Sequence, residues 1–205
     1  MRRRRESLSH RNRVLTEISA LYAVRERPKA AVIVQRELRQ KKPSPKFFSE
    51  LFIHLSLFLG YPAMLEGLET VAEVSLRRKR RSLRARGSTA HKQGQRILER
   101  IYGEQTSKLL RRLDNLHPGL GHRITQEAYG LIMNRDGLTL PERELANVVV
   151  LHAHSFDRQL YSHLRGAIRV GISKSTLQRV IVLTSDIVGI ASSRTLATID
   201  NLQTE

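Results

Sequence analysis

The stretch "LTLPERELANVVVLHAHSFDRQLYSHLRGAIRVGISKSTLQRVI", residues 138–181, carries the pattern that decides the fold. Residues 145–154 are mostly apolar, broken only by Asn147 and two histidines, which is typical of a helix buried on most sides. From Phe156 onward the apolar residues recur at the three- and four-residue spacing of an amphipathic helix. Pro141 suits a helix start, because its missing N–H would be unpaired there in any case. The stretch therefore predicts two successive helices joined by a tight turn.

Polar and glycine residues indicate where these helices begin and end. We expect Ser155 to cap the start of the second helix, with Asp157 in its first turn, where the helix dipole favours an anion. Gly171 is expected to end that helix, and Ser173 to cap a third helix over residues 176–190. No convincing alternation of apolar and polar residues predicts a strand, so the fold class is all-α.

An internal repeat extends the helical pattern to the first part of the chain. A shift of 129 residues places Ser44 over Ser173 and Gly60 over Gly189, each pair bounding an apolar segment. Upstream of Ser44 the similarity continues only as helical patterning. The repeat predicts two related helical units joined by a basic linker. The expected boundaries are residues 1–75 for the first unit, 76–92 for the linker and 93–202 for the second unit.

The composition narrows the classes of function. The chain has 205 residues, a formal net charge of +17 and no cysteine. Thiolate nucleophiles, disulfides and zinc–cysteine sites are therefore excluded. Two basic runs, Arg2–Arg5 and Arg77–Arg86, could bind phosphate backbones. No aromatic residues alternate with them to stack on bases, so a solvated tail and linker are the favoured interpretation. Nucleic acid is thus a possible partner but not the favoured one.

The apolar segments predict neither a secretory leader nor a membrane span. The basic N-terminus is not followed by the apolar stretch that a leader requires. The longest apolar run, residues 47–65, is interrupted by Glu50, His54 and the Gly60-Tyr61-Pro62 break, whereas a bilayer requires about 20 continuous apolar residues. We expect a buried helix and turn there, a cytoplasmic location and no membrane partner.

Glu144 and His163 are the pair that could carry chemistry. They are separated by one helix, a turn and most of a second helix, so antiparallel packing would bring them together. A carboxylate beside an imidazole orients the ring and gives an acid/base group near neutral pH. Two structural alternatives stay open: Glu144 as a partner of the helix dipole, and His163 as a buried packing residue. His152 and His154 point to different helix faces, so we expect no metal site.

Four segments carry a resemblance to a known family. They are "EAYGLIMNRDGLTLPERE" at 127–144, the Arg143-Glu144-Leu145 helix start, "HLRGAIRVGIS" at 163–173 and "HLSLFLGYPAMLEGLE" at 54–69. Together they resemble the carboxymuconolactone decarboxylase family, which shares its all-helical fold with the alkylhydroperoxidase D-like proteins. The resemblance covers roughly residues 93–202, and the first unit retains the motif of the closing helix pair.

The resemblance implies a reaction class and site residues. Peroxidase-type relatives have a Cys-x-x-Cys pair where this chain has Phe156 and Gln159, so a thiol peroxidase is not expected. The decarboxylase-type relatives imply cofactor-independent, lyase-type acid/base chemistry on a small carboxylated lactone or keto acid, in a pocket beside the histidine. The implied residues are His163 as acid/base, Glu144 as its orienting group, and Arg143 and Arg165 as anion clamps. No metal or organic cofactor is implied.

Each unit lacks something that the other retains. In the second unit Ile190 and Ala191 replace the aromatic residue and proline of the family's closing break. In the first unit Leu15 and Val34 stand where the 129-residue shift would place the pair. We therefore expect a complete site to combine both halves or two subunits, and the resemblance implies a homo-oligomer. The alternative is a non-catalytic assembly or regulatory protein that contacts nucleic acid through its linker.

Overall fold

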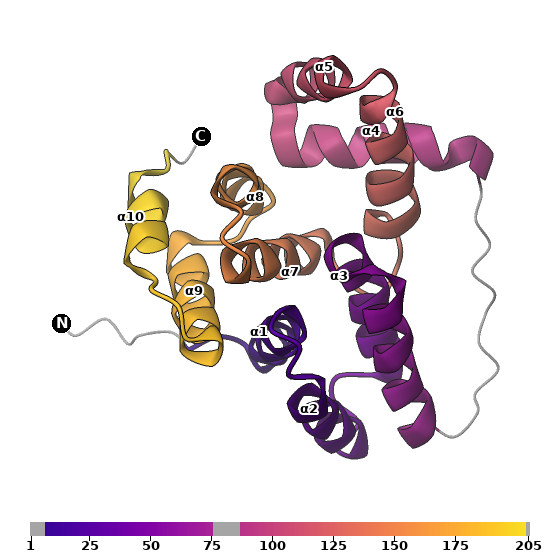
Figure 1. The fold of residues 1–205 in the computed structure, drawn as a ribbon, viewed down its shortest axis with the longest axis vertical. Helices are drawn as coiled ribbons and strands as arrows, with labels where there is room; N and C mark the ends of the chain where they lie inside the picture. The colour runs from indigo at the N-terminus through magenta and orange to yellow at the C-terminus, as the bar shows by residue number, and fades with distance from the viewer. Residues whose placement is uncertain (1–6, 76–86, 204–205) are drawn as a thin grey trace.

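The computed structural model describes residues 7–75 and 87–203, and within these ranges the chain forms helices and no strand (Figure 1). The all-α prediction is confirmed. The central helix α7 (Leu140–Ala153) lies between the helices of the first part of the chain and α8 (Asp157–Arg169). Glu144 lies on α7 and His163 on α8, so the candidate pair sits where these two central helices pack.

The first part of the chain forms α1 (His10–Ala23), α2 (Arg27–Arg39) and α3 (Pro45–Val74). The hydroxyl of Ser44 accepts a hydrogen bond from the N–H of Phe47 at 3.4 Å and caps α3. Gly60 has φ 76° and breaks α3 just before Pro62, as the sequence predicts. By length and composition alone α3 is apolar enough to cross a membrane. The break at Gly60 divides it, and its first half packs into the protein core.

A separate layer of helices follows the break in the described chain. It comprises α4 (Gly87–Tyr102), α5 (Thr106–Leu116), α6 (Leu120–Ile124) and a π-helical turn, η2 (Thr125–Met133), with a short 3-10 turn between α4 and α5. Gly94 of α4 and Gly130 of η2 let the two backbones approach closely, since a side chain at either position would strike the other backbone. Because α4 begins at Gly87, residues 87–92 belong to a helix rather than to the predicted linker.

The last part of the chain contains α7, α8, α9 (Lys174–Val188) and α10 (Ser193–Asn201). Thr139 and Glu142 form a reciprocal capping box at the start of α7, with Pro141 in the first turn. The hydroxyl of Ser173 accepts a hydrogen bond from the N–H of Thr176 at 3.1 Å, as predicted. Each start signal uses a side-chain oxygen to satisfy a backbone N–H that the helix leaves unpaired.

The predicted cap at Ser155 is wrong. Ser155 has φ 56°, a left-handed conformation, and Phe156 occupies the cap position of α8 without a side-chain hydrogen bond. The turn is instead closed by backbone bonds from the N–H of Phe156 to the carbonyl of Leu151 at 3.0 Å and from the N–H of Ser155 to the carbonyl of His152 at 3.1 Å. The tightness of the turn, rather than capping, decides the conformation of this serine.

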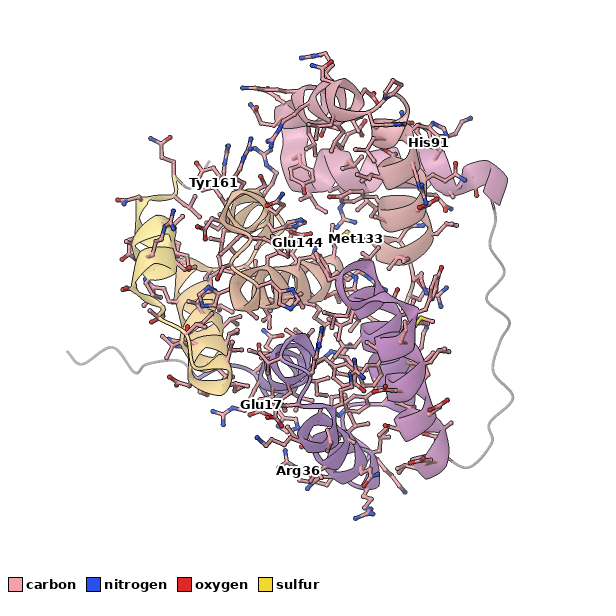
Figure 2. The ribbon with its side chains drawn as sticks, in the orientation of Figure 1. Glu17, Arg36, His91, Met133, Glu144 and Tyr161 are labelled. Atoms are coloured by element: carbon pink, nitrogen blue, oxygen red, sulfur yellow. The ribbon has the colours of Figure 1, made fainter. Side chains whose placement is uncertain are left out.

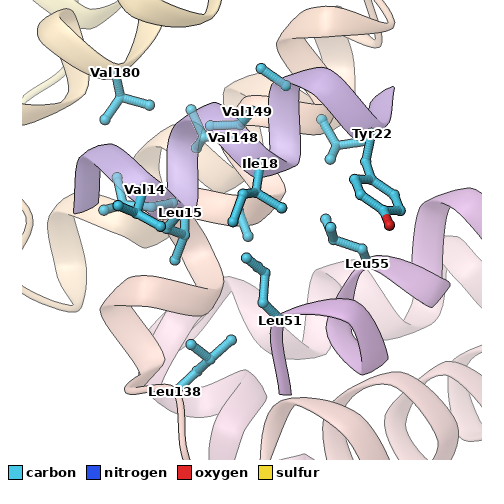
Figure 3. Close-up of a cluster of buried hydrophobic side chains, with 14 of the residues drawn as sticks. Val14, Leu15, Ile18, Tyr22, Leu51, Leu55, Leu138, Val148, Val149 and Val180 are labelled. Atoms are coloured by element: carbon cyan, nitrogen blue, oxygen red, sulfur yellow. The ribbon is translucent and has the colours of Figure 1, made fainter. Parts of the chain in front are cut away.

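One hydrophobic core joins the first and last parts of the chain (Figure 3). Val14, Leu15 and Ile18 of α1 pack with Val148 and Val149 of α7, and all five are essentially inaccessible to water. The first half of α3 and the interior face of α9 extend the same core. Burying large aliphatic side chains contributes about 1.5–3 kcal/mol each relative to exposure. The two parts therefore stabilise each other rather than folding around separate cores.

The backbone geometry of the two parts corresponds closely. Left-handed residues end equivalent helices in the pairs Arg25 and Ser155, Lys41 and Gly171, and Gly60 and Gly189. The first two pairs are 130 positions apart and the third 129, because the first part has one more residue before α3. These shared turns support the prediction of two related units.

The positions of these turns change which residues of the first unit correspond to Glu144 and His163. With a spacing of 130 over the first two helices, Glu144 corresponds to Val14 and His163 to Ile33, one position earlier than the predicted residues in each case. Val14 is a core residue and Ile33 packs against the core. The first unit thus has no acid/base pair at the equivalent place.

Candidate active site

Glu144 and His163 meet as predicted. Nδ1 of His163 lies 2.9 Å from Oε2 of Glu144. Glu144 is 0% exposed, whereas the side chain of His163 is 13% exposed. Figure 2 labels Glu144 at the centre of the molecule, where α7 and α8 approach each other. A buried carboxylate therefore holds one nitrogen of a histidine whose side chain still reaches the surface.

The other nitrogen of the histidine is available. Within the described residues Nε2 of His163 has no hydrogen-bond partner. The ring of Tyr102, from the end of α4, packs edge-on to the His163 ring at a centroid distance of 6.2 Å. His163 is therefore not sealed in apolar packing. The carboxylate fixes its inner nitrogen, and the outer nitrogen can exchange a proton with another molecule.

Two tyrosines complete the wall beside the pair. The hydroxyls of Tyr102 and Tyr129 lie 2.9 Å apart and form a hydrogen bond. Burial raises the pKa of Tyr102 well above its ordinary value, and the nearby Tyr129 hydroxyl and Glu144 carboxylate raise it further. Burial likewise raises the pKa of Tyr129, and the Glu144 charge adds to this effect. Both phenols therefore stay neutral, and Glu144 and His163 are the groups of this site that can hold and transfer a proton.

Asn147 and His54 extend the pair into the first unit. The amide nitrogen of Asn147 donates a hydrogen bond to Oε1 of Glu144 at 3.0 Å. Nε2 of His54, from α3, lies 2.8 Å from Oδ1 of Asn147. Both side chains are essentially inaccessible to water. The site thus draws on both halves of the chain, which supports the expectation of a combined site.

Arg143 does not fit the predicted role of an anion clamp. Its side chain is 0% exposed, and Nη2 donates a hydrogen bond to the carbonyl of Arg135 at 2.7 Å. The same nitrogen lies 3.5 Å from the carboxylate of Glu50, which Arg135 also binds through two hydrogen bonds. Burial lowers the pKa of Arg143 to about 10, so it is still charged at neutral pH. Its charge is compensated inside the protein.

Arg165 lies on the exposed side of α8. It follows His163 by two positions, and two positions on a helix turn by about 200°. The two side chains therefore leave α8 in nearly opposite directions. The structure does not bring this predicted clamp next to His163.

Gly166 is a site residue that sequence reasoning missed. A side chain there would collide with Ile101 of α4 and approach Oε2 of Glu144 to 3.1 Å. The glycine lets α8 lie close to both α4 and the carboxylate. Three other missed residues, Asn147, His54 and Tyr102, come from separate helices. Asn147 and His54 are visible in the sequence as polar residues within apolar segments, whereas no sequence signal marked Tyr102.

The positions that the resemblance assigns to the peroxidase cysteines are exposed. Phe156 and Gln159 lie on the outer side at the start of α8, and neither can form a thiolate. The described residues contain no group of three or more histidines and carboxylates that could hold a metal ion. His152 bonds the Ser185 and Thr195 hydroxyls, and His154 bonds the carbonyl of Ala23.

Two cavities in the described part of the chain lie away from the candidate pair. One, of about 360 Å³, lies where α1, α7 and α9 begin, and another, of about 200 Å³, separates α8 from α10. Neither is lined by Glu144 or His163. The predicted pocket beside the histidine is therefore neither of these two, and the His163 side chain is 13% exposed.

Comparisons with known proteins match the family that the sequence resembles. The carboxymuconolactone decarboxylase family matches residues 118–199, a range that includes Glu144, Asn147 and His163. The 4-carboxymuconolactone decarboxylase of Acinetobacter baylyi is 28% identical over 104 residues, which cover 50% of this chain and 78% of that protein. Peroxisomal protein 2 of Saccharomyces cerevisiae is 26% identical over 129 residues, which cover 62% of this chain. The aligned part spans 45% of the yeast protein.

Proposed function

Because the chain belongs, through residues 118–199, to the carboxymuconolactone decarboxylase family, we propose that it is a lyase acting by acid/base catalysis. Its substrate is a small carboxylated lactone or keto acid, the class to which the substrate named for the bacterial relative belongs. The observation that carries the proposal is the 2.9 Å contact between Glu144 and Nδ1 of His163, which leaves Nε2 open.

The chemistry required is a single exchange of a carboxylate for a proton. The bond between the substrate carbon and its carboxylate breaks, carbon dioxide leaves, and the electron pair passes into the conjugated lactone or keto group. Nε2–H of the His163 imidazolium then donates its proton to a carbon of that conjugated system. The charge of Glu144 stabilises the imidazolium before transfer, as a carboxylate beside a catalytic histidine does.

The absence of cysteine is the reason that we propose a lyase and not a thiol peroxidase. No thiolate can form anywhere in the chain. Phe156 and Gln159 occupy the positions of the cysteine pair of peroxidase-type relatives. The proposed reaction uses side chains alone and needs neither a metal ion nor an organic cofactor.

We also propose a homo-oligomer in the cytoplasm. Large apolar side chains on the surface support self-association: Tyr61, beside the break in α3, is 73% exposed, and Leu65 lies one turn further along the same face. A second copy of the chain could cover them and enclose the exposed edge of His163.

The direct test is carbon dioxide release by the purified full chain from 4-carboxymuconolactone and a panel of related lactone and keto acids. Release above the uncatalysed rate from at least one of them is expected. Peroxide consumption with a dithiol reductant, measured in parallel, is expected to stay at the blank rate. No carbon dioxide release from any member of the panel would overturn the proposal.

The second candidate function is a non-catalytic assembly or regulatory protein that contacts nucleic acid through its basic linker. The residues that would do so, Arg77–Arg86, lie outside the described part of the chain. Salt-sensitive binding of duplex DNA that disappears when this run is neutralised, together with no turnover, would favour it.

A further inference from the structure

A continuous chain of polar side chains connects α3 with the candidate acid/base residue. Nδ1 of His54 lies 3.5 Å from Nη1 of Arg143. Nε2 of His54 faces Oδ1 of Asn147, and the amide nitrogen of Asn147 faces Glu144. Glu144 in turn contacts Nδ1 of His163. Apart from His163, these side chains are at most 1% exposed, so water does not substitute for the contacts.

The donors and acceptors at the two ends of this series of contacts fix the direction of each hydrogen bond in it. A guanidinium has only donors, so the nitrogen of His54 that faces Arg143 must be unprotonated. The proton of His54 is then on Nε2, from which it is donated to the carbonyl oxygen of Asn147. The amide NH₂ of Asn147 is thereby turned toward Glu144, whose ionised carboxylate only accepts. The opposite orientation of the amide would place acceptor against acceptor.

The charge state of His54 agrees with this assignment. Burial, reinforced by the Arg143 charge, lowers the pKa of His54 from 6.5 to about 3. His54 is therefore neutral over the whole physiological pH range and can keep one fixed tautomer. It is a directional hydrogen-bond bridge and not itself a proton donor to substrate.

The contact between Asn147 and His163 fits the same assignment. The amide nitrogen of Asn147 lies 3.3 Å from Nδ1 of His163. When Nδ1 carries a proton, both groups are donors, and the carboxylate of Glu144 is the acceptor that they share. Asn147 and His163 therefore bind the two oxygens of one carboxylate, which sets its rotation.

We propose that His54 and Asn147 are positioning residues that hold Glu144 so that neutral His163 keeps its proton on Nδ1. The inference rests on the proposed acid/base role of His163. Donating a proton from Nε2 leaves the imidazole in the Nδ1–H form, the tautomer that a correctly placed Glu144 stabilises. With Glu144 misplaced, the neutral ring could carry its proton on Nε2, where no lone pair remains to accept the next proton.

According to this assignment, the first unit helps to position the acid/base pair of the second unit. The first unit carries no acid/base pair at the equivalent positions, but its helix α3 supplies His54. The dependence on His54 also means that the second unit alone lacks one member of the chain of contacts.

Histidine tautomers measured by NMR on the full chain labelled with ¹⁵N-histidine test the inference without any substrate. Ring-nitrogen shifts and long-range ¹H–¹⁵N correlations distinguish the two neutral tautomers. At pH 8.5 we expect His163 as Nδ1–H, and from pH 5 to 8.5 we expect His54 as Nε2–H. A His54 ring protonated on Nδ1, or charged at pH 5, would overturn the assignment.

Two variants of His54 separate positioning from packing. His54→Leu is expected to give a mixture of His163 tautomers, whereas His54→Gln, which retains an N–H donor, restores the Nδ1–H form. His117→Leu, at an exposed histidine outside the site, is the matched control and leaves His163 unchanged. If His54→Leu does not fold, Asn147→Leu must give the same mixture.

A folded His54→Leu or Asn147→Leu chain whose His163 stays entirely Nδ1–H contradicts the inference. Its failure is distinguishable from failure of the proposed function. A wild-type chain with both expected tautomers that releases no carbon dioxide keeps the positioning assignment and rejects the reaction.

Discussion

His54 and Asn147 are 93 positions apart in the chain, yet Nε2 of one lies 2.8 Å from Oδ1 of the other in a fully buried contact. This contact joins α3 to α7. Only the side chain of Asn147 separates His54 from the candidate acid/base pair, because Asn147 itself binds Glu144. Substitutions in α3 that alter this contact are therefore expected to change the positions of Glu144 and His163 as well as overall stability.

The stability of the protein is expected to fall with acidification, partly through His54. Its pKa is about 3 in the folded protein against 6.5 for an ordinary histidine. Between these two pH values the unfolded chain therefore binds a proton that the folded protein does not bind. The contribution is fully present above pH 6.5 and is lost as the pH falls toward 3. The expected slope is about 1 kcal/mol per pH unit for this group.

Urea unfolding at pH 7, 6, 5 and 4 measures this slope. His54→Gln is expected to flatten it, whereas His117→Gln, at an exposed position, is expected to leave it unchanged. His152, whose pKa burial also lowers, would supply the slope that persists in His54→Gln. Equal slopes in the wild type and His54→Gln would mean that His54 is protonated in the folded protein.

Glu50 is expected to be far more important for stability than its position on an apolar helix suggests. It is the carboxylate that compensates buried Arg143, and Arg135 binds it at 2.6 and 2.8 Å. Glu50→Gln leaves a buried guanidinium without an anion, which costs about 3–5 kcal/mol of unfolding free energy.

The matched control lies on the same helix. Glu66 pairs with Arg27 in a solvent-exposed salt bridge, so Glu66→Gln is expected to change the unfolding free energy by about 1 kcal/mol or less. Chemical denaturation of both variants gives the comparison. Similar losses in the two would show that burial of Arg143 does not depend on Glu50.

Gly166→Ala is expected to disturb the site through packing. The added methyl group would collide with Ile101 and press on Glu144. Overpacking of this kind costs about 1–3 kcal/mol, and the shifted carboxylate should lower turnover as well. Ser162→Ala, on the same helix at a half-buried serine whose hydroxyl bonds only the carbonyl of Arg158, is the control and should stay within about 0.5 kcal/mol. Wild-type stability in Gly166→Ala would indicate that α8 and α4 can separate at no cost.

The sequence was sufficient to predict α7, α8 and α9 and the meeting of Glu144 with His163. Local signals explain this success, since helix spacing, Pro141 and Ser173 act over a few residues. The carboxylate and the histidine then follow from two adjacent antiparallel helices. The break at Gly60 was predictable for the same local reason.

His54 and Asn147 were not predictable as partners, because their contact depends on how α3 packs across α7. No periodicity in either segment encodes that crossing. Each residue is visible in the sequence only as a polar exception within an apolar run. The register of the repeat was likewise off by one residue over the first two helices, because the extra residue before α3 has no clear signature.

Arg143 shows why charge alone misleads. An arginine in a first helical turn suggests a surface cation, but Glu50 and the carbonyl of Arg135 give it partners in the interior. Ser155 shows the same limit for caps, since its residue type favours a cap whereas the tight turn imposes a left-handed backbone.

The central claim is that His163 transfers the proton, and the turnover number of His163→Ala tests it most directly. With a substrate that the wild-type chain decarboxylates, kcat is expected to fall by about 10²–10⁴-fold while the helical circular dichroism signal stays unchanged. His154→Ala, at the residue that follows the end of α7 and outside the site, provides the control and should retain wild-type kcat. A folded His163→Ala chain with kcat within about threefold of the wild-type value would contradict the account.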